Sequence, residues 1–168
     1  MHFRLLLLVP LILGPLLAAA SQPATPTQPS APMNAPTVTL GYVLLTVKSV
    51  PASLGFYEKA FGLKRRFLHE DGDKAYGELE TGATRLGFVS LAQAESTLGC
   101  TPLTSTPNTP PLAMEIALVS QDVAGVYEQA LKAGAKAHSA PTAKPWGQVV
   151  AYVRDPDGHL VELCSPMP

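Results

Sequence analysis

Two glutamates carry the chemistry that this sequence suggests most directly. Glu162 follows a turn sequence, Asp-Pro-Asp-Gly at residues 155–158, and Glu115 lies near the start of another β-rich segment. Two carboxylates that face one cavity repel each other unless a cation, a proton or an arginine lies between them. Such a pair could bind a small cationic molecule, or act as a general acid or base if the pKa of one glutamate is raised. Glu115 and Glu162 are therefore the candidate catalytic residues.

A β-hairpin is predicted to place Glu162. The segments 148–154 and 160–164 are β-rich, and the turn between them contains Pro156, which fixes φ, and Gly158, which supplies a positive φ. Alternation along a strand then puts Leu160, Glu162 and Cys164 on one face. The hairpin thus presents one carboxylate at a fixed place on a partly apolar surface.

The chain repeats one order of elements twice. In the first half, a strand at 43–47 and a helix at 51–61 precede strands at 63–69, 75–80 and 84–91. In the second half, a strand at 113–119 and a helix between Asp122 and Gly134 precede strands at 135–139, 148–154 and 160–164. Tyr42 lies eight residues before Val50, and Glu115 lies eight residues before Val123. The halves therefore superpose as β-α-β-β-β modules.

This order predicts an α+β fold, with module one at 38–91, a Thr- and Pro-rich linker at 92–111 and module two at 112–168. Each amphipathic helix is expected to cover the outer face of its own curved mixed sheet, so that the inner faces surround a cleft. An α+β sandwich with a filled interior is the alternative, and periodicity does not exclude it.

Strand alternation selects the side chains that share the cleft with the two glutamates. In the first strand, Tyr42 lies on one face with Leu44 and Thr46. In the strand at 148–154, the small apolar residues 149, 151 and 153 share one face, which leaves the opposite face for the cleft. A loop at 141–147 could close over a ligand through Trp146. The predicted ligand-binding residues are Tyr42, Glu115, Trp146, Gln148, Tyr152, Arg154 and Glu162.

Each candidate also has a structural interpretation. Glu162 could form an ion pair with Arg154, Arg65 or Arg66, because buried carboxylates are usually paired. Arg65 and Arg66 must point to opposite faces of a strand, so at most one enters the cleft. Trp146 could anchor its loop in the core, and tyrosines on strands are common as packing.

The first 37 residues are predicted to lie outside the fold. Arg4, an apolar run from Leu5 to Leu17 and three alanines before Ser21 form a signal-peptide pattern at 1–20. A membrane span is the alternative, but the run contains two prolines and is shorter than the roughly 20 residues that a bilayer needs. Residues 21–37 are uncharged and rich in proline, which predicts an extended tether. We therefore expect an exported protein, periplasmic or extracellular, without a stable membrane span after cleavage.

Charge and cysteine content limit the partners. Loss of Arg4 with the leader lowers the basic residues from 12 to 11 against 13 acidic ones, a net charge of −2. This weak acidity argues against nucleic-acid binding, which needs a basic patch. Cys100 and Cys164 could form one disulfide, and the sequence leaves their pairing open.

The segments 54–63 (LGFYEKAFGL) and 155–163 (DPDGHLVEL) resemble the vicinal oxygen chelate (VOC) superfamily, which includes glyoxalase I, bleomycin-resistance proteins and extradiol dioxygenases. The resemblance covers residues 40–166 and implies the VOC, glyoxalase-like fold. Metal-dependent members hold a metal with four ligands on strands, commonly His or Gln, Glu, His and Glu. Those positions fall on Tyr42, Gly87, Glu115 and Glu162, whereas His69, His138 and His159 fall elsewhere.

Glycine has no side chain and tyrosine would be an unusual ligand, so the resemblance does not supply a full ligand set. We expect no tightly bound cofactor. Glu115 and Glu162 are the metal candidates if a divalent metal binds, because two carboxylates plus water could hold a hard cation weakly.

The leading hypothesis is an exported VOC protein that binds a small polar or cationic molecule in an acidic, aromatic-lined cleft. The alternative is a metal-dependent VOC enzyme, lactoylglutathione-lyase-like or dioxygenase-like, with an atypical ligand set. A secreted interaction module with a filled cleft is a third hypothesis. Whether a reaction is catalysed stays open, and the resemblance implies a homodimer.

Overall fold

The computed structural model describes residues 37–168, and Val38–Pro168 form one compact unit. The predicted leader at 1–20 and all but the last residue of the predicted tether lie outside the described residues. Within the described part, no helix is long and apolar enough to cross a membrane. The elements are β1 (Tyr42–Val47), α1 (Val50–Phe61), β2 (Lys64–Asp71), β3 (Lys74–Glu80), β4 (Arg85–Ser90), α2 (Leu91–Leu98), β5 (Glu115–Val119), α3 (Val123–Ala133), β6 (Lys136–Ala143), β7 (Val149–Arg154) and β8 (Leu160–Cys164).

The two long helices begin and end where capping residues predict. The Ser49 and Asp122 side chains accept hydrogen bonds from backbone N–H groups in the first turns of α1 and α3. Gly62 and Gly134 end these helices in the left-handed conformation, with φ of 68° and 110°. Both predicted helices are confirmed: α1 begins one residue earlier than predicted, and α3 lies between Asp122 and Gly134 as predicted.

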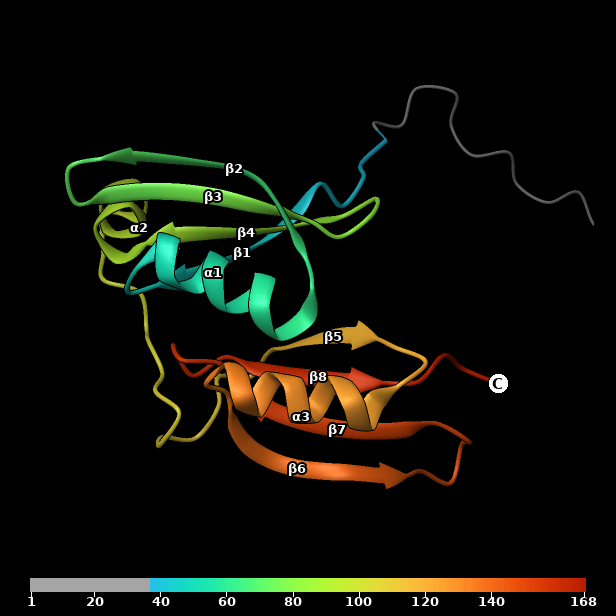
Figure 1. Ribbon diagram of the computed structural model, residues 1–168. Coiled ribbons are helices and arrows are strands. Elements are labelled where there is room, and N and C mark those ends of the chain that lie inside the picture. Colours follow the sequence, from blue (N-terminus) through green and yellow to red (C-terminus); the bar gives the residue numbers. More distant parts are fainter. Residues whose placement is uncertain (1–36) are drawn as a thin grey trace, which may run out of the picture. The chain divides into compact units, whose positions relative to one another are not determined.

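The strands form two separate four-stranded sheets with the same topology. Their orders are β1-β4-β3-β2 and β5-β8-β7-β6 (Figure 1). The first strand of each module runs parallel to the last one, and the other pairings are antiparallel. The two β-α-β-β-β modules predicted from the repeat are therefore confirmed, with sheets that do not close into a barrel.

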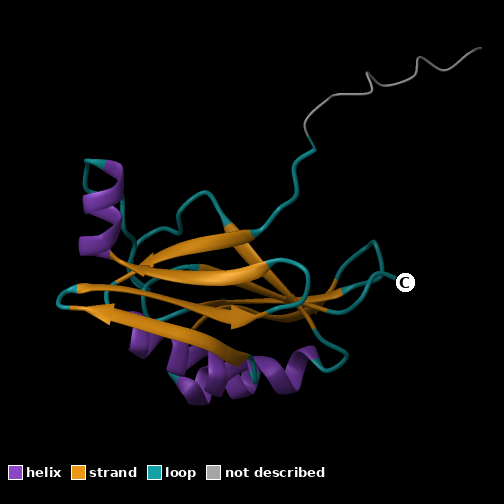
Figure 2. Ribbon diagram, turned by 90° about the horizontal axis from the view of Figure 1, so that it is seen from above, coloured by secondary structure: helices purple, strands orange, loops and turns teal. Residues whose placement is uncertain are grey.

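The core lies between the sheets and their two long helices. α1 and α3 cover the same side of the strand layer (Figure 2). Alternate strand residues point toward these helices, and Leu45, Leu79, Val153 and Leu163 are at most 1% exposed. We call the opposite side of each sheet its open face. The predicted arrangement, with a helix on one face of each sheet, is confirmed.

A third helix, α2, follows β4 within the segment predicted as linker. Its N-cap is Ser90, whose hydroxyl accepts a hydrogen bond from the Gln93 N–H at 3.3 Å, and its C-cap is Gly99. Only Ala94 of this eight-residue helix is buried. The sequence did not predict α2 because such a short helix with one buried residue has almost no apolar stripe.

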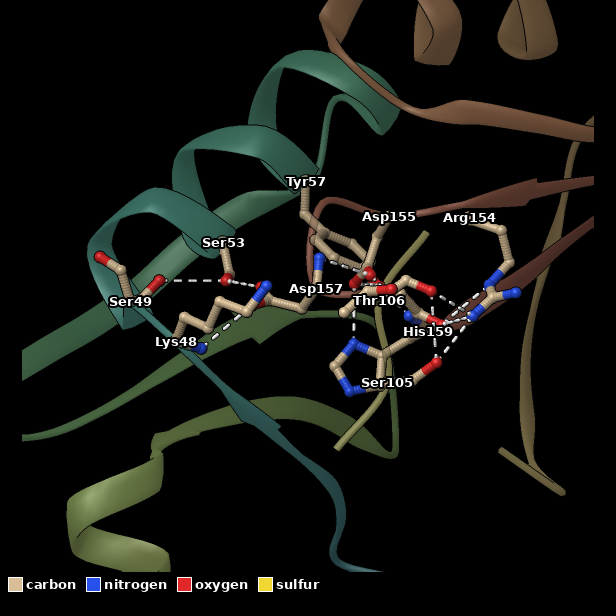
Figure 3. Close-up of polar contacts among 11 residues, drawn as sticks. Lys48, Ser49, Ser53, Tyr57, Ser105, Thr106, Arg154, Asp155, Asp157 and His159 are labelled. Carbon is tan, nitrogen blue, oxygen red and sulfur yellow. Dashed lines mark hydrogen bonds and ion pairs between the residues drawn. The ribbon is translucent and has the colours of Figure 1, made fainter. Parts of the chain in front are cut away.

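The turn between β7 and β8 is fastened to α1 through Asp155. This carboxylate is fully buried, accepts a hydrogen bond from the Tyr57 hydroxyl at 3.1 Å and lies 2.9 Å from His159 Nδ1 (Figure 3). Burial, followed by the charge of Asp155, raises the pKa of Tyr57 well above its ordinary value, which keeps the phenol a donor. Module one thus holds the turn that leads into Glu162.

Asp157 makes a second attachment in the same turn. Its carboxylate accepts hydrogen bonds from the Lys48 N–H at 3.0 Å and from the Ser53 hydroxyl at 2.7 Å, at the start of α1 (Figure 3). A negative charge beside a helix N-terminus is favourable. Gly158 has φ of 94°, as its place in the turn predicts.

Candidate functional site

Glu115, Tyr152 and Glu162 come together on the open face of module two. β8 lies between β5 and β7, and Glu162 pairs with Ala117 on one side and with Tyr152 on the other. The Tyr152 hydroxyl donates a hydrogen bond to Glu162 Oε2 at 3.3 Å. Strand register therefore produces the group, because all three side chains point away from α3.

Glu162 affects the protonation of Glu115. Desolvation, a side-chain hydrogen bond with Glu162 and the charge of Glu162 together raise the pKa of Glu115 above its usual value of 4.5. Across residues 37–168, no arginine, lysine or histidine forms an ion pair with either glutamate. A proton or an external cation is what would relieve the repulsion between them.

The charge of Glu162 also affects the pKa values of Tyr152 and Cys164. Desolvation and then the charges of Glu162 and Glu115 raise the pKa of Tyr152, and desolvation and Glu162 raise the pKa of Cys164. The His138 ring meets the Tyr152 ring edge to face, with 6.3 Å between the ring centroids. The site thus combines two acids with neutral donors and aromatic surface.

Neither Arg65 nor Arg66 pairs with Glu162. Arg65 forms an ion pair with Glu58 at 2.8 Å, and Arg66 lies 3.8 Å from Glu78 and 3.9 Å from Glu80. The ion-pair interpretation of Glu162 is therefore wrong for Arg65 and Arg66.

Arg154 is buried in a structural role. Its guanidinium donates to Ser105 Oγ at 2.8 Å (Figure 3). It also donates to Thr109 O at 2.8 Å and, through Nε, to Gly158 O at 2.8 Å. Only 3% of Arg154 is exposed. It ties the linker to the β7–β8 turn and does not pair with Glu162.

The other predicted ligand-binding residues lie apart from the acidic pair. Tyr42 is half exposed on β1, in the other sheet. Trp146 is 54% exposed and donates from Nε1 to Gln148 Oε1 at 2.8 Å, while Gln148 Nε2 donates to Ser165 O at 2.7 Å. Trp146 is thus a surface residue, and its interpretation as a core anchor is wrong.

The four strand positions of the metal-dependent pattern do not form a ligand set here. A Cβ at Gly87 would lie 3.0 Å from Leu44 Cδ1 and 3.4 Å from the Tyr76 hydroxyl, so neighbours already fill that space. In the described part of the chain, no three His, Cys, Asp or Glu side chains form a group that could hold a metal ion. Cys100 is exposed and Cys164 is buried, and both are free thiols.

Sequence reasoning missed a buried acid in module one. Glu78 pairs with Gly87 across β3 and β4 and is 6% exposed. The Tyr76 hydroxyl donates to it at 2.8 Å, and Arg85 Nε lies 3.1 Å away. The alternation of Tyr76 and Glu78 along β3 was a signal for this cluster, because it puts both residues on the open face.

Two cavities flank the acidic pair. A cavity of about 630 Å³ lies between the modules and does not reach Glu115 or Glu162. A more open hollow of about 380 Å³ lies beside Glu115, lined also by Leu112, Ala113, Met114 and Leu160. The expected cleft around both glutamates is therefore an open surface with a hollow at Glu115.

Comparison with known proteins agrees with this architecture. The family model described as Glyoxalase/Bleomycin resistance protein/Dioxygenase superfamily matches residues 39–163. A search of the curated proteins finds no match.

Solved structures share the fold at low sequence identity. A glyoxalase-related enzyme from Fulvimarina pelagi is 24% identical, with a TM-score of 0.64, and the match covers 76% of this chain and 88% of that one. A glyoxalase/bleomycin resistance protein/dioxygenase family enzyme from Burkholderia phytofirmans PsJN is 19% identical, with a TM-score of 0.64 and coverage of 76% and 98%. A glyoxalase I mutant from Zea mays is 17% identical, with a TM-score of 0.56, and the match covers 76% of this chain and 47% of that one.

Proposed function

We propose that this chain, which belongs to the Glyoxalase/Bleomycin resistance protein/Dioxygenase superfamily, binds a small cationic molecule on the open face of module two. Glu115 and Glu162 would hold the positive charge, and Tyr152 would orient Glu162. The observation that carries the proposal is the acidic pair itself, which has no basic partner among residues 37–168.

A cationic ligand suits this site for an electrostatic reason. Desolvation contributes most to the raised pKa of Glu115, and a hydrogen bond with Glu162 and the charge of Glu162 add to it, so a second negative charge beside Glu162 has a cost. A ligand cation between the carboxylates removes that cost and makes charge-assisted hydrogen bonds. The apolar surface of Met114 and Leu160 in the adjoining hollow favours a cation with an aromatic or aliphatic body.

Benzamidine and benzamide test the proposal, because they share a shape and differ in charge. Calorimetric titration of the full-length protein should give saturable binding of benzamidine and much weaker binding of benzamide. Glu162→Gln should weaken benzamidine binding by about tenfold, since charge-assisted hydrogen bonds contribute about 1.5–3 kcal/mol. Glu128→Gln, on the exposed surface of α3, is the matched control and should bind normally. Equal affinities for both probes, or an unaffected Glu162→Gln variant, would contradict the proposal.

A metal-dependent activity is the second candidate, supported by the two carboxylates, which offer oxygen ligands for a hard cation. The same titrations repeated after chelation, and after addition of Mg²⁺ or Zn²⁺, separate the two functions. Binding that survives chelation supports the metal-free proposal. Stoichiometric metal in the purified protein, with turnover that chelation abolishes, supports the enzyme instead.

The proposal includes export and self-association. The leader pattern at 1–20 predicts that the mature protein begins at Ser21, which N-terminal sequencing of the exported protein would detect. Tyr42 and Leu44 on β1 and Val119 on β5 are apolar and at least 40% exposed, which favours a homodimer. Sedimentation velocity would distinguish a dimer from a monomer.

A further inference from the structure

We propose that the cavity between the modules is a second binding site, for a compact apolar anion such as a medium-chain carboxylate, with Arg85 as the anchor of the anionic group. This site is separate from the acidic pair and has the opposite charge preference. It does not depend on the function proposed for Glu115 and Glu162.

The cavity exists because the two sheets do not pair with each other. β1 and β5 are edge strands of separate sheets, and the cavity of about 630 Å³ lies beside both. Its volume falls within the usual range of small-molecule sites, about 300–1,000 Å³. Apolar side chains from both modules form most of its wall, namely Val43, Phe61, Leu63, Leu86, Ile116, Leu118 and Val126.

The charge of the lining selects an anion. Arg85 is the one ionisable residue among those that line the cavity, and no aspartate or glutamate lies in its wall. A cation in the cavity would meet the guanidinium, whose nearest carboxylate, Glu78, is not among the lining residues. An anion with an apolar body would instead gain both the charge interaction and the burial of its hydrocarbon.

The polar atoms at the cavity have hydrogens to donate. Arg85 Nε lies 3.1 Å from the Glu78 carboxylate but makes no well-directed hydrogen bond to any described residue. The Ser120 hydroxyl accepts a hydrogen bond from the Asp122 N–H at 3.0 Å, and its own hydrogen is not used by a described acceptor. Thr81 and Thr84, by contrast, already donate to backbone carbonyl groups. The unused groups are donors, so they match the acceptor oxygens of a carboxylate.

Glu78 does not remove Arg85 from this role. Its carboxylate lies 3.1 Å from Arg85 Nε, but it also accepts a hydrogen bond from Tyr76 at 2.8 Å and has Arg66 at 3.8 Å. Glu78 thus shares its charge among three groups. About a third of the Arg85 side chain remains exposed, which leaves the outer guanidinium accessible to a ligand.

Three probes of one chain length test the site: decanoate, decan-1-ol and decylamine. Isothermal titration of the full-length protein should give saturable binding with decanoate and about tenfold weaker binding with the alcohol. Decylamine is compared in the Glu162→Gln variant, where the acidic pair no longer attracts an amine, and should bind there most weakly of the three. Arg85→Met should weaken decanoate binding by about tenfold and leave the alcohol unchanged, whereas Arg85→Lys should keep the preference for decanoate. Arg65→Met, a matched change outside the cavity, should bind all three probes normally.

Three more variants distinguish loss of the cavity site from misfolding and from binding at another site. Arg85→Met leaves Glu78 without its nearest cation, so the double variant Glu78→Gln/Arg85→Met is measured as well and should show the same loss. Val126→Phe adds volume on the α3 wall and should weaken decanoate and decanol together. Glu162→Gln should bind decanoate normally. No saturable binding of decanoate, equal affinities for decanoate and decanol, or loss in Glu162→Gln but not in Arg85→Met would overturn the proposal.

Discussion

The Tyr57 hydroxyl of α1 donates a hydrogen bond to the buried carboxylate of Asp155, 98 residues further along the chain. This contact joins the helix of module one to the β7–β8 turn of module two. Because β8 begins a few residues after Asp155 and contains Glu162, the contact also helps to set the position of the acidic pair.

Tyr57→Phe should lower the free energy of unfolding by about 2 kcal/mol, because the carboxyl group of Asp155 loses a hydrogen bond while it remains buried. Urea unfolding followed by tryptophan fluorescence would measure the change. Tyr127→Phe is the matched control, since Tyr127 is also buried but its hydroxyl makes no hydrogen bond in the described part of the chain. Equal losses in the two variants would contradict a specific role for the Tyr57–Asp155 contact.

Gly158→Ala should be far more destabilising than Gly82→Ala. Both glycines have positive φ, 94° and 93°, so both substitutions carry the backbone cost of about 1 kcal/mol. A Cβ at Gly158 would also lie 2.5–2.7 Å from backbone atoms of Thr106, whereas nothing lies within 4 Å of one at Gly82. The thermal midpoint should fall several degrees further in Gly158→Ala. Similar midpoints would show that the linker moves away from the turn without cost.

Glu115 should give the stability of the protein a specific pH dependence. Its pKa is raised in the folded state, so between 4.5 and the raised value the folded protein binds the proton more tightly than the unfolded chain does. The contribution of this group to stability is therefore full below 4.5 and is lost as the pH rises through the folded-state pKa. Urea unfolding at a series of pH values should show this loss in the native sequence and in Glu128→Gln, but not in Glu115→Gln. Parallel profiles for the native protein and Glu115→Gln would contradict the prediction.

The turn and the strand register could be predicted from the sequence because their signals are local. Pro156 and Gly158 determine the turn within four residues, and alternation along β8 puts Glu162 on the face opposite the core. The pairing of Glu162 with Tyr152 then follows from the hairpin register. The acidic pair is therefore the part of the site that sequence patterns support best.

The role of Arg154 could not be predicted from the sequence, because the residues that it binds lie in a segment without hydrophobic periodicity or a recognisable motif. The guanidinium bonds to Ser105 and Thr109, which lie 49 and 45 residues earlier in a segment rich in threonine and proline. Alternation of side chains along β7 puts Arg154 on the same face as Tyr152. It does not indicate which distant segment packs over that residue. The same limit applies to Arg85 and the cavity between the modules, which depend on how two separate sheets come together.

The bond between the Lys48 N–H and Asp157 joins residues that are 109 positions apart. Together with the Tyr57–Asp155 contact, it means that a chain built from two similar halves does not fold as two independent repeats. The contacts that α1 makes with Asp155 and Asp157 form only when the last hairpin is present, so most of the chain must be synthesised before the final packing is possible. Long-range closure of this kind favours slow folding in a single cooperative step. Separately expressed halves should therefore be poorly structured alone and should recover native structure only when mixed.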